Sequence, residues 1–230
     1  MTEVPDETAT FDRYAQDYDR LHAQSLGASG ESPGYFAEYK ARCLERLGVP
    51  GTARILDYGC GIGNLLVHLA ERFATVHGYD PSPESLALAR DRVPKATLHE
   101  SRKALPAGAF DAVVLANVLH HVPPEARAEL VAGLAPLLVP GGRLFVFEHN
   151  PYNPLTRRAV AACEFDADAV LLAPKEVKRL LLGAGLADVR LDFIVFFPRV
   201  LAAFRFLEPA LAWLPAGAQT LTVATRYPAG

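Results

Sequence analysis

The stretch that decides the fold is Ile55-Leu-Asp-Tyr-Gly-Cys-Gly-Ile-Gly-Asn-Leu65. A short apolar run ends at Asp57, as expected for a buried strand, and an apolar helical pattern begins after the last glycine. Gly59, Gly61 and Gly63 lack a Cβ, so the backbone can turn tightly and approach a ligand closely. The stretch therefore predicts a strand, a ligand-binding loop and a helix in succession.

The glycine spacing disfavours a dinucleotide as the ligand. A dinucleotide fingerprint has its third glycine three residues after the second, and Asn64 occupies that position here. Asp57 would also face a pyrophosphate with the wrong sign, whereas its carboxylate can accept hydrogen bonds from a cation. We therefore expect a ligand with an amino-acid ammonium group.

A second acid, Asp80, follows the next strand-like run, Ala74-Thr-Val-His-Gly-Tyr79. Asp80 lies 23 residues after Asp57 (80 − 57), close to the offset of about 20 at which an acidic residue binds ribose hydroxyls in doubly wound folds. Ser82, with Ser85 three residues later, predicts the N-cap of the helix that comes next. A nucleoside with an amino-acid tail satisfies both acids.

With these motifs in this order, the chain resembles the class I S-adenosylmethionine-dependent methyltransferase family. Later stretches are similar to the family's fourth strand and to its turn and fifth strand: Leu105-Pro106 with Phe110–Val122, and Leu138–Phe147. Phe11–Asp19 resembles the opening helix of the small-molecule and ubiquinone or menaquinone branches. The resemblance is good over about residues 11–150 and holds only in outline beyond them.

The pattern of elements predicts an α/β fold. Strand-like runs near 53–57, 75–79, 95–98, 111–116 and 143–148 alternate with helical segments near 63–72, 83–90 and 123–137, which indicates a parallel sheet with helices on both faces. A helix at 175–183 and strands at 188–196 and 219–226 follow. The resemblance implies a doubly wound, Rossmann-like, mostly parallel seven-stranded sheet with an antiparallel last strand and an N-terminal helical lid.

The chain of 230 residues fits one domain in three parts. We expect a disordered tail at 1–10, a helical lid at 11–50 with helices near 11–24 and 34–47, and a methyltransferase core at 51–230. Within the core, 198–214 is an aromatic and proline-rich insertion. We expect about two thirds of the aromatic side chains in and before it to fill the core, and the others to line an acceptor pocket or form a membrane-facing or dimer surface; the residues are Phe193, Phe196, Phe197, Phe204, Phe206 and Trp213.

The resemblance implies S-adenosyl-L-methionine as the cofactor. It places the amino-acid tail on Asp57 and the glycine loop, and the ribose on Asp80. The family's aspartate after the third strand is absent, so Ser101 or Glu100 must take its place. The full set of expected cofactor-binding residues is Tyr14, Tyr18, Asp57, Gly59, Cys60, Gly61, Asn64, Leu65, Asp80, Pro81, Ser101, Asn117 and Val118.

The expected acceptor is a small molecule, most simply an oxygen of a natural product, quinone-like ring, sugar or lipid-linked intermediate. A hydroxyl acceptor benefits from a nearby imidazole as base, whereas a carboxylate needs none. His149 is the catalytic candidate, because it follows the fifth strand where the acceptor pocket should open; alternatively it only hydrogen-bonds loop backbone. The expected acceptor-binding residues are Tyr35, His121, Glu148, Tyr152 and Phe197.

Two other functions remain open at this point. A protein that binds S-adenosylmethionine for regulation or partner binding would use the same fold, and a pocket blocked by 198–214 would favour it. A nicotinamide oxidoreductase is less suited, because the chain lacks both the spaced glycine and a Tyr-x-x-x-Lys pair. The acceptor itself and the oligomeric state, monomer or homodimer, do not follow from the sequence.

The composition limits the ligands and the cellular location that we expect for the protein. The net charge of −3 and the pI of about 6.2 offer no basic field for nucleic acid. Cys43, Cys60 and Cys163 lack CxxC spacing, so we expect neither disulfides nor a metal site, and we interpret Cys60 as a small side chain, not a nucleophile. The polar first ten residues predict no secretory signal, and no apolar run reaches the roughly 18 residues of a membrane span. We expect a cytoplasmic protein for which peripheral membrane contact is possible.

Overall fold

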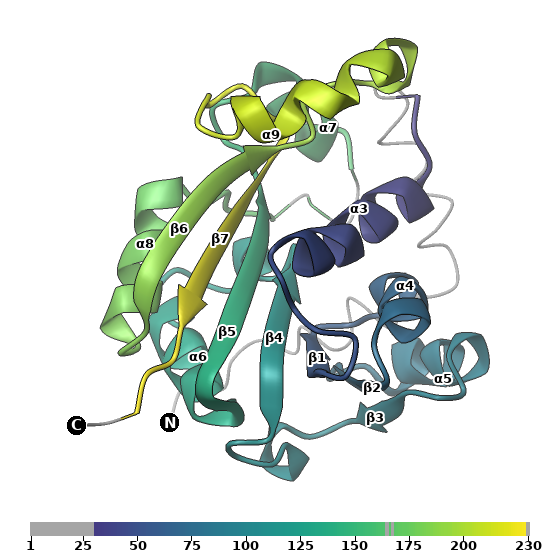
Figure 1. Cartoon of the computed structure of the whole chain (residues 1–230), viewed down its shortest axis with the longest axis vertical. Coiled ribbons are helices and arrows are strands. Elements are labelled where there is room, and N and C mark those ends of the chain that lie inside the picture. The colour runs from purple at the N-terminus through teal and green to yellow at the C-terminus, as the bar shows by residue number, and fades with distance from the viewer. Residues whose placement is uncertain (1–29, 164–165, 167, 229–230) are drawn as a thin grey trace.

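The computed structural model describes residues 30–163, 166 and 168–228. Their centre is one seven-stranded sheet in the order β3-β2-β1-β4-β5-β7-β6 (Figure 1). Strand β7 is antiparallel to both neighbours, and the other pairs are parallel. The strands are β1 Arg54–Tyr58, β2 Thr75–Tyr79, β3 Thr97–His99, β4 Phe110–Ala116, β5 Leu138–His149, β6 Ala187–Ile194 and β7 Gln219–Thr225. This confirms the expected fold class.

Helices cover both faces of the sheet (Figure 1). The α-helices are α3 Pro33–Arg46, α4 Asn64–Arg72, α5 Pro83–Arg92, α6 Arg127–Leu134, α7 Pro154–Ala161, α8 Pro174–Gly183 and α9 Glu208–Leu211. The 3-10 segments include η1 Arg102–Ala104, η2 Leu119–His121, η3 Ala135–Leu137 and η5 Arg199–Leu207. The expected cap of α5 is confirmed, because the Ser82 hydroxyl accepts a hydrogen bond of 3.0 Å from the Ser85 N–H.

The core consists of two apolar layers, one on each face. Val114 of β4 packs in the layer beneath α3 and α4, whereas its neighbours Val113 and Leu115 pack in the layer beneath α6 and α8. This alternation follows from the two-residue period of a strand. Because both faces are covered, the open side for a ligand is the edge where the parallel strands end.

The polar residues of the predicted site lie at that edge. Strands β1, β2, β4 and β5 run in the same direction, so their carboxyl ends lie together. Asp57 and Glu148 are near the ends of their strands, while Asp80 and Asn117 directly follow theirs. The sheet thus brings together side chains that are up to 91 positions apart (148 − 57).

Two expectations about segments were wrong in part. The helix predicted at 123–137 is shorter, because Pro123 begins a turn closed by the Ala126 N–H and Pro136 lacks the N–H that an α-helix needs. The aromatic residues near 198–214 do not mainly fill the core: only Phe193 of the six is buried, and Phe206 and Trp213 are 75% and 74% exposed. Segment η5, the yellow-green stretch before α9, lies over the end of the sheet (Figure 1) and contributes no buried residue.

Several expectations fall on residues outside those described. They are the tail at 1–10, the helix near 11–24, and Tyr14 and Tyr18. Of the expected lid, α3 is described, one residue earlier than predicted at each end. None of the helices in the described ranges is both long enough and apolar enough to cross a membrane.

Arg127 should be a main determinant of stability. Its guanidinium is buried and donates to the Val122 and Val170 carbonyls at 2.9 and 2.7 Å and to Glu176 at 2.8 Å. Arg127→Met leaves these acceptors without a donor, so the free energy of unfolding in urea should fall by about 3 kcal/mol. Arg157→Met, on the exposed side of α7, is the matched control and should stay within about 0.5 kcal/mol of wild type. Equal losses in both variants would contradict this role.

Candidate functional site

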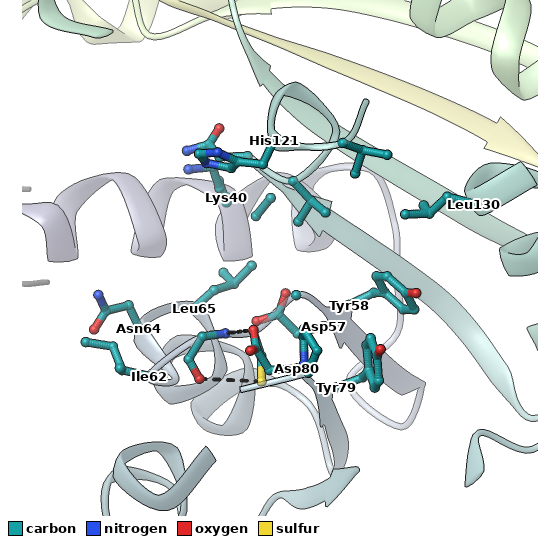
Figure 2. A pocket seen from close by; sticks show the side chains of 18 of the residues that line it. Lys40, Asp57, Tyr58, Ile62, Asn64, Leu65, Tyr79, Asp80, His121 and Leu130 are labelled. Atoms are coloured by element: carbon teal, nitrogen blue, oxygen red, sulfur yellow. Dashed lines mark hydrogen bonds between the residues drawn. The ribbon is translucent and has the colours of Figure 1, made fainter. Parts of the chain in front are cut away.

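A cavity of about 510 Å³ lies at the carboxyl edge of the sheet. Residues from α3, the glycine loop, the end of β2 and the segment after β4 line it (Figure 2). Most of the residues predicted to bind the cofactor are among them: Asp57, Gly59, Cys60, Gly61, Asn64, Leu65, Asp80, Pro81, Asn117 and Val118. Ser101 is not, because its side chain caps η1, and the next residue, Arg102, lines the cavity instead.

The glycine loop is held tightly against its neighbours. The N–H groups of Gly59 and Cys60 donate to the Tyr79 carbonyl at 2.7 and 2.9 Å. Gly59 has φ +80°, and a Cβ there would lie 2.7 Å from a methyl group of Val118. Both the backbone conformation and the crowding therefore require glycine at this position.

Asp80 is fixed by backbone donors. Its Oδ2 accepts from the Gly61 N–H at 2.8 Å (Figure 2). Its Oδ1 accepts from the Ser82 N–H at 2.9 Å. These bonds hold the buried carboxylate in one orientation at the cavity wall. Since a carboxylate oxygen can accept more than one hydrogen bond, Asp80 can also receive hydroxyl groups from a ligand.

Asp57 and Asn117 supply buried acceptors that lack donors. Both carboxylate oxygens of Asp57 and the Oδ1 of Asn117 are buried without a hydrogen-bond partner among the described residues. Asn117 also has φ +60°, an uncommon conformation that is often found at ligand sites. Burial and the neighbouring Asp80 raise the pKa of Asp57 to about 7, although Lys40 opposes the shift. A positively charged donor would supply the missing hydrogen bonds and would balance the buried negative charge of Asp57.

Lys40 is a site residue that the sequence reasoning missed. It belongs to α3, is buried, and lines the cavity. Burial lowers its pKa to about 8, while Asp57 and Glu148 act to raise it. The signal was present in the sequence: Ala37, Lys40, Ala41 and Leu44 follow the i, i+3, i+4, i+7 spacing of a buried helix face.

A buried histidine cluster lies next to the cavity. Glu148 Oε2 is 2.6 Å from His120 Nδ1, and its Oε1 accepts from the Leu119 N–H at 2.8 Å. Burial alone would lower the pKa of His120, but Glu148 and Asp166 outweigh it and raise the pKa to about 9. Burial and His120 lower the pKa of His121 to about 4. Of these residues only His121 lines the cavity.

The other residues predicted for catalysis and acceptor binding lie away from the cavity wall. The His149 ring packs 5.1 Å from that of His120, and burial lowers the pKa of His149 to about 3. Tyr35 packs under the Arg205 guanidinium, and Phe197 beside Phe204. Glu148 is directed to His120, and Tyr152 is 54% exposed.

Burial keeps the pKa of the Cys60 thiol well above its ordinary value. This agrees with the interpretation of Cys60 as a small side chain.

Comparisons with known proteins bear on this arrangement. Residues 55–142 match the family described as "Methyltransferase domain". Trans-aconitate 2-methyltransferase of Mycobacterium ulcerans (strain Agy99) is 31% identical over 198 residues, which cover 78% of this chain and 73% of the relative. The chain belongs to the class I S-adenosylmethionine-dependent methyltransferases. Ubiquinone biosynthesis O-methyltransferase of Xanthomonas axonopodis pv. citri is another relative, 32% identical over 65% of this chain and 67% of its own length.

Solved structures agree on the fold of this methyltransferase. A possible histamine N-methyltransferase from Thermotoga maritima has a TM-score of 0.67 at 18% identity and covers 95% of this chain and 98% of its own. Magnesium protoporphyrin IX methyltransferase from Synechocystis PCC 6803, with S-adenosylmethionine bound, has a TM-score of 0.65 at 16% identity, covering 98% and 100%. The cofactor of the methyltransferase is S-adenosylmethionine, as expected.

The cavity suits this cofactor chemically. An α-ammonium group offers three donors and a positive charge, and the buried acceptors of Asp57 and Asn117 at the cavity wall lack donors from the described residues. Asp80, fixed by two backbone donors, suits the ribose hydroxyls. We expect these three side chains to bind the two polar ends of the nucleoside.

The affinity for the cofactor should depend on pH through Asp57. With a pKa of about 7, raised by burial, Asp57 must lose its proton before it can pair with an ammonium. Affinity for S-adenosylhomocysteine should therefore rise, by up to about tenfold per pH unit, between pH 5 and 7, and then level off. The sign is opposite for folding: a raised pKa means that the stability contributed by Asp57 is lost as the pH rises from about 4 to about 7.

Calorimetric titration across this range measures the effect. Asp57→Asn should bind more weakly at pH 7 and lose the rise in affinity with pH. A wild-type affinity that stays constant from pH 5 to 7 would contradict the pairing.

Proposed function

We propose that this methyltransferase transfers the methyl group to an oxygen atom of a small acidic acceptor, a carboxylic acid or an acidic hydroxyl compound. The observation that carries the proposal is the buried ammonium of Lys40 in the cavity wall. Among the described residues it makes no hydrogen bond or ion pair, although Asp57 and Glu148 act on it at longer range. A buried cation without a close partner favours an anionic ligand group.

The relatives support an oxygen acceptor of this kind. One is named for trans-aconitate, itself a carboxylate, and another for O-methyl transfer in ubiquinone biosynthesis. The matched region covers 73% of the length of the first relative and 67% of the length of the second. An acid and a hydroxyl compound are the two acceptor classes that these names suggest for the present chain.

The residues of the chain act by binding and orientation. The bound cofactor supplies an electrophilic methyl group on a sulfonium sulfur; the acceptor oxygen donates an electron pair to the methyl carbon, and the carbon–sulfur bond breaks with its electrons on sulfur. Asp57, Asn117 and Asp80 hold the nucleoside, and Lys40 holds the anionic group of the acceptor. Alignment of this kind can contribute up to about 7–11 kcal/mol to a displacement reaction. His121 contacts the acceptor from the segment after β4.

The aromatic insertion at 198–214 does not favour the alternative of a regulatory or partner-binding protein without methyltransferase activity. A blocked pocket would have favoured the regulatory alternative, but no described residue of 198–214 lines the cavity. We place the acceptor on the side of the cavity formed by α3, η2 and the following segment.

Lys40→Met tests the proposal. The variant keeps most of the side-chain volume but removes the charge, so the KM for a carboxylate acceptor such as trans-aconitate should rise by at least about tenfold, roughly 1.4 kcal/mol. Because Lys40 lowers the pKa of Asp57, the affinity for S-adenosylhomocysteine is compared well above pH 7, where it should be retained. Formation of S-adenosylhomocysteine is measured for carboxylates, phenols and uncharged alcohols in parallel, with Lys178→Met on the exposed face of α8 as control. Turnover confined to uncharged acceptors, or an unchanged KM in Lys40→Met, would refute it.

The prediction that His149 is the base for a hydroxyl acceptor is not favoured by its position, because it does not line the cavity and burial lowers its pKa to about 3. A general base typically contributes about 10²- to 10⁴-fold, so His149→Ala would lower turnover of a phenol by at least about 100-fold if His149 takes the proton. Turnover of a carboxylate, which has no proton to lose, should change little. Equal activity of wild type and His149→Ala on the phenol would show that positioning alone suffices.

A further inference from the structure

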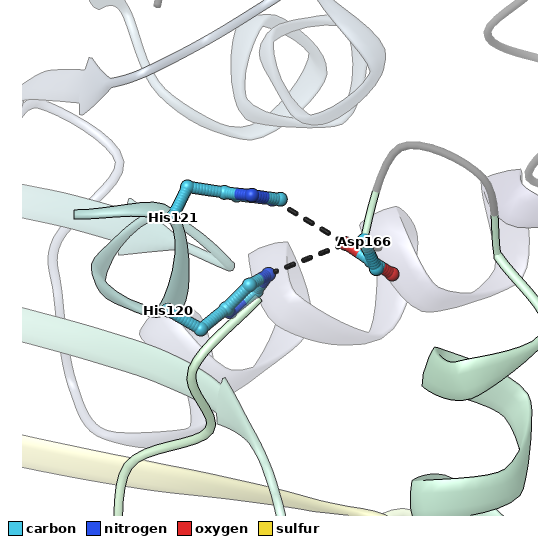
Figure 3. A group of neighbouring side chains, drawn as sticks. All are labelled: His120, His121 and Asp166. Carbon is cyan, nitrogen blue, oxygen red and sulfur yellow. Dashed lines mark ion pairs between the residues drawn. The ribbon is translucent and has the colours of Figure 1, made fainter. Parts of the chain in front are cut away.

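Two consecutive histidines meet an aspartate that lies 45 positions further along the chain (166 − 121). His120 and His121 form the end of η2, and Asp166 reaches them from the segment before α8 (Figure 3). Asp166 Oδ1 is 3.6 Å from His120 Nε2 and 3.4 Å from His121 Nε2. One ligand atom from each of the three side chains lies within 4.8 Å of the others.

These separations match a shared metal ion. With bonds of about 2.0–2.2 Å to nitrogen and oxygen, a tetrahedral ion holds its ligand atoms about 3.4 Å apart. The observed 3.4 and 3.6 Å agree with that spacing. Both are longer than the usual 2.7–3.2 Å of an N–H···O hydrogen bond. Two imidazoles and one carboxylate are also a ligand set that first-row transition metals prefer.

His120 is already oriented as a ligand. Glu148 Oε2 lies 2.6 Å from its Nδ1, so in the neutral imidazole that binds a metal the proton is on Nδ1 and the lone pair of Nε2 is directed toward Asp166. A carboxylate behind the imidazole is the common outer partner of a metal-bound histidine. His120 is 1% exposed, and its Nε2 has no hydrogen-bond partner among the described residues. A buried imidazole nitrogen without a hydrogen-bond partner favours a bound ligand at this position.

The charges favour an ion over a proton. Glu148 and Asp166 are buried carboxylates on opposite sides of His120, and a single imidazolium balances only one of them. Lys40 acts on Glu148 at longer range, but among the described residues it forms no ion pair with either carboxylate. A divalent cation with neutral imidazoles balances both carboxylates.

We propose that His120 Nε2, His121 Nε2 and the Asp166 carboxylate bind one divalent first-row transition metal ion, such as Zn²⁺, beside the acceptor side of the cavity. The expectation of no metal rested on cysteine spacing and did not consider these residues. His121 lines the cavity, so an open position on the ion would face the acceptor. Its use in binding the acceptor oxygen rests on the proposed function, whereas the site itself does not.

Metal binding is measured directly on the full chain without cofactor or acceptor. Protein stripped with a chelator is titrated with Zn²⁺ in a calorimeter, and with Co²⁺ in an absorption spectrometer. We expect one equivalent of Zn²⁺ and visible Co²⁺ bands of a nitrogen- and oxygen-ligated site. His121→Ala and Asp166→Ala should weaken Zn²⁺ binding by about 100-fold or more, because even outer-shell partners contribute about 10- to 100-fold.

His68→Ala is the matched control, since His68 lies on α4 outside the cluster and should leave Zn²⁺ binding unchanged. Circular dichroism and S-adenosylhomocysteine binding check that each variant folds. A stripped wild type that binds no Zn²⁺ at about 100 µM, or variants that bind it like wild type, would overturn the site. Zinc binding without methyl transfer to acids would instead refute only the proposed function.

Discussion

The buried carboxylate of Asp57, which has no hydrogen-bond donor among the residues that the structure describes, is the constraint on which the site depends. A group of this kind costs free energy in the protein alone, and burial raises its pKa toward neutrality as a result. The neighbouring Lys40 and Asn117 do not supply the missing donor. The fold therefore holds an acceptor ready for a cation, and the ammonium of S-adenosylmethionine meets that requirement.

The rest of the edge is arranged around this carboxylate. The parallel strands β1, β2 and β4 end side by side, so the glycine loop, Asp80 and the segment after β4 all border one cavity. Val118 packs so closely on Gly59 that only glycine fits, and this contact joins the cofactor loop to the acceptor side. Behind the cavity wall, Glu148 at the end of β5 orients His120, which belongs to η2 in the segment after β4. The residues proposed to bind the cofactor and the acceptor are thus positioned by the same few strand ends.

Local pattern predicted the fold and most of the residues that line the cavity from the strand ends and the glycine loop. Asp57, Asp80 and Asn117 are examples whose place at a strand end follows from the chain alone. The residues proposed to bind the acceptor and the metal were harder to predict. Lys40 lies on a helix whose burial depends on packing against α4, and Asp166 meets His120 only through the tertiary fold. The aromatic residues after β6 were placed in the core by composition, but the two apolar layers are filled without most of them.

The most direct test of the account compares two ligands that differ in the amino-acid portion. Calorimetric titration at pH 7 with S-adenosylhomocysteine and with 5′-methylthioadenosine, which lacks the ammonium and carboxylate, measures the contribution of the amino-acid portion, and the Asp57→Asn variant assigns the part of it that is due to Asp57. We predict that S-adenosylhomocysteine binds at least about 100-fold more tightly, as charge-assisted hydrogen bonds of about 1.5–3 kcal/mol each require. We also predict that Asp57→Asn removes most of the difference. Equal affinities of the two ligands for the wild-type protein would contradict the claim that the buried carboxylate binds the ammonium.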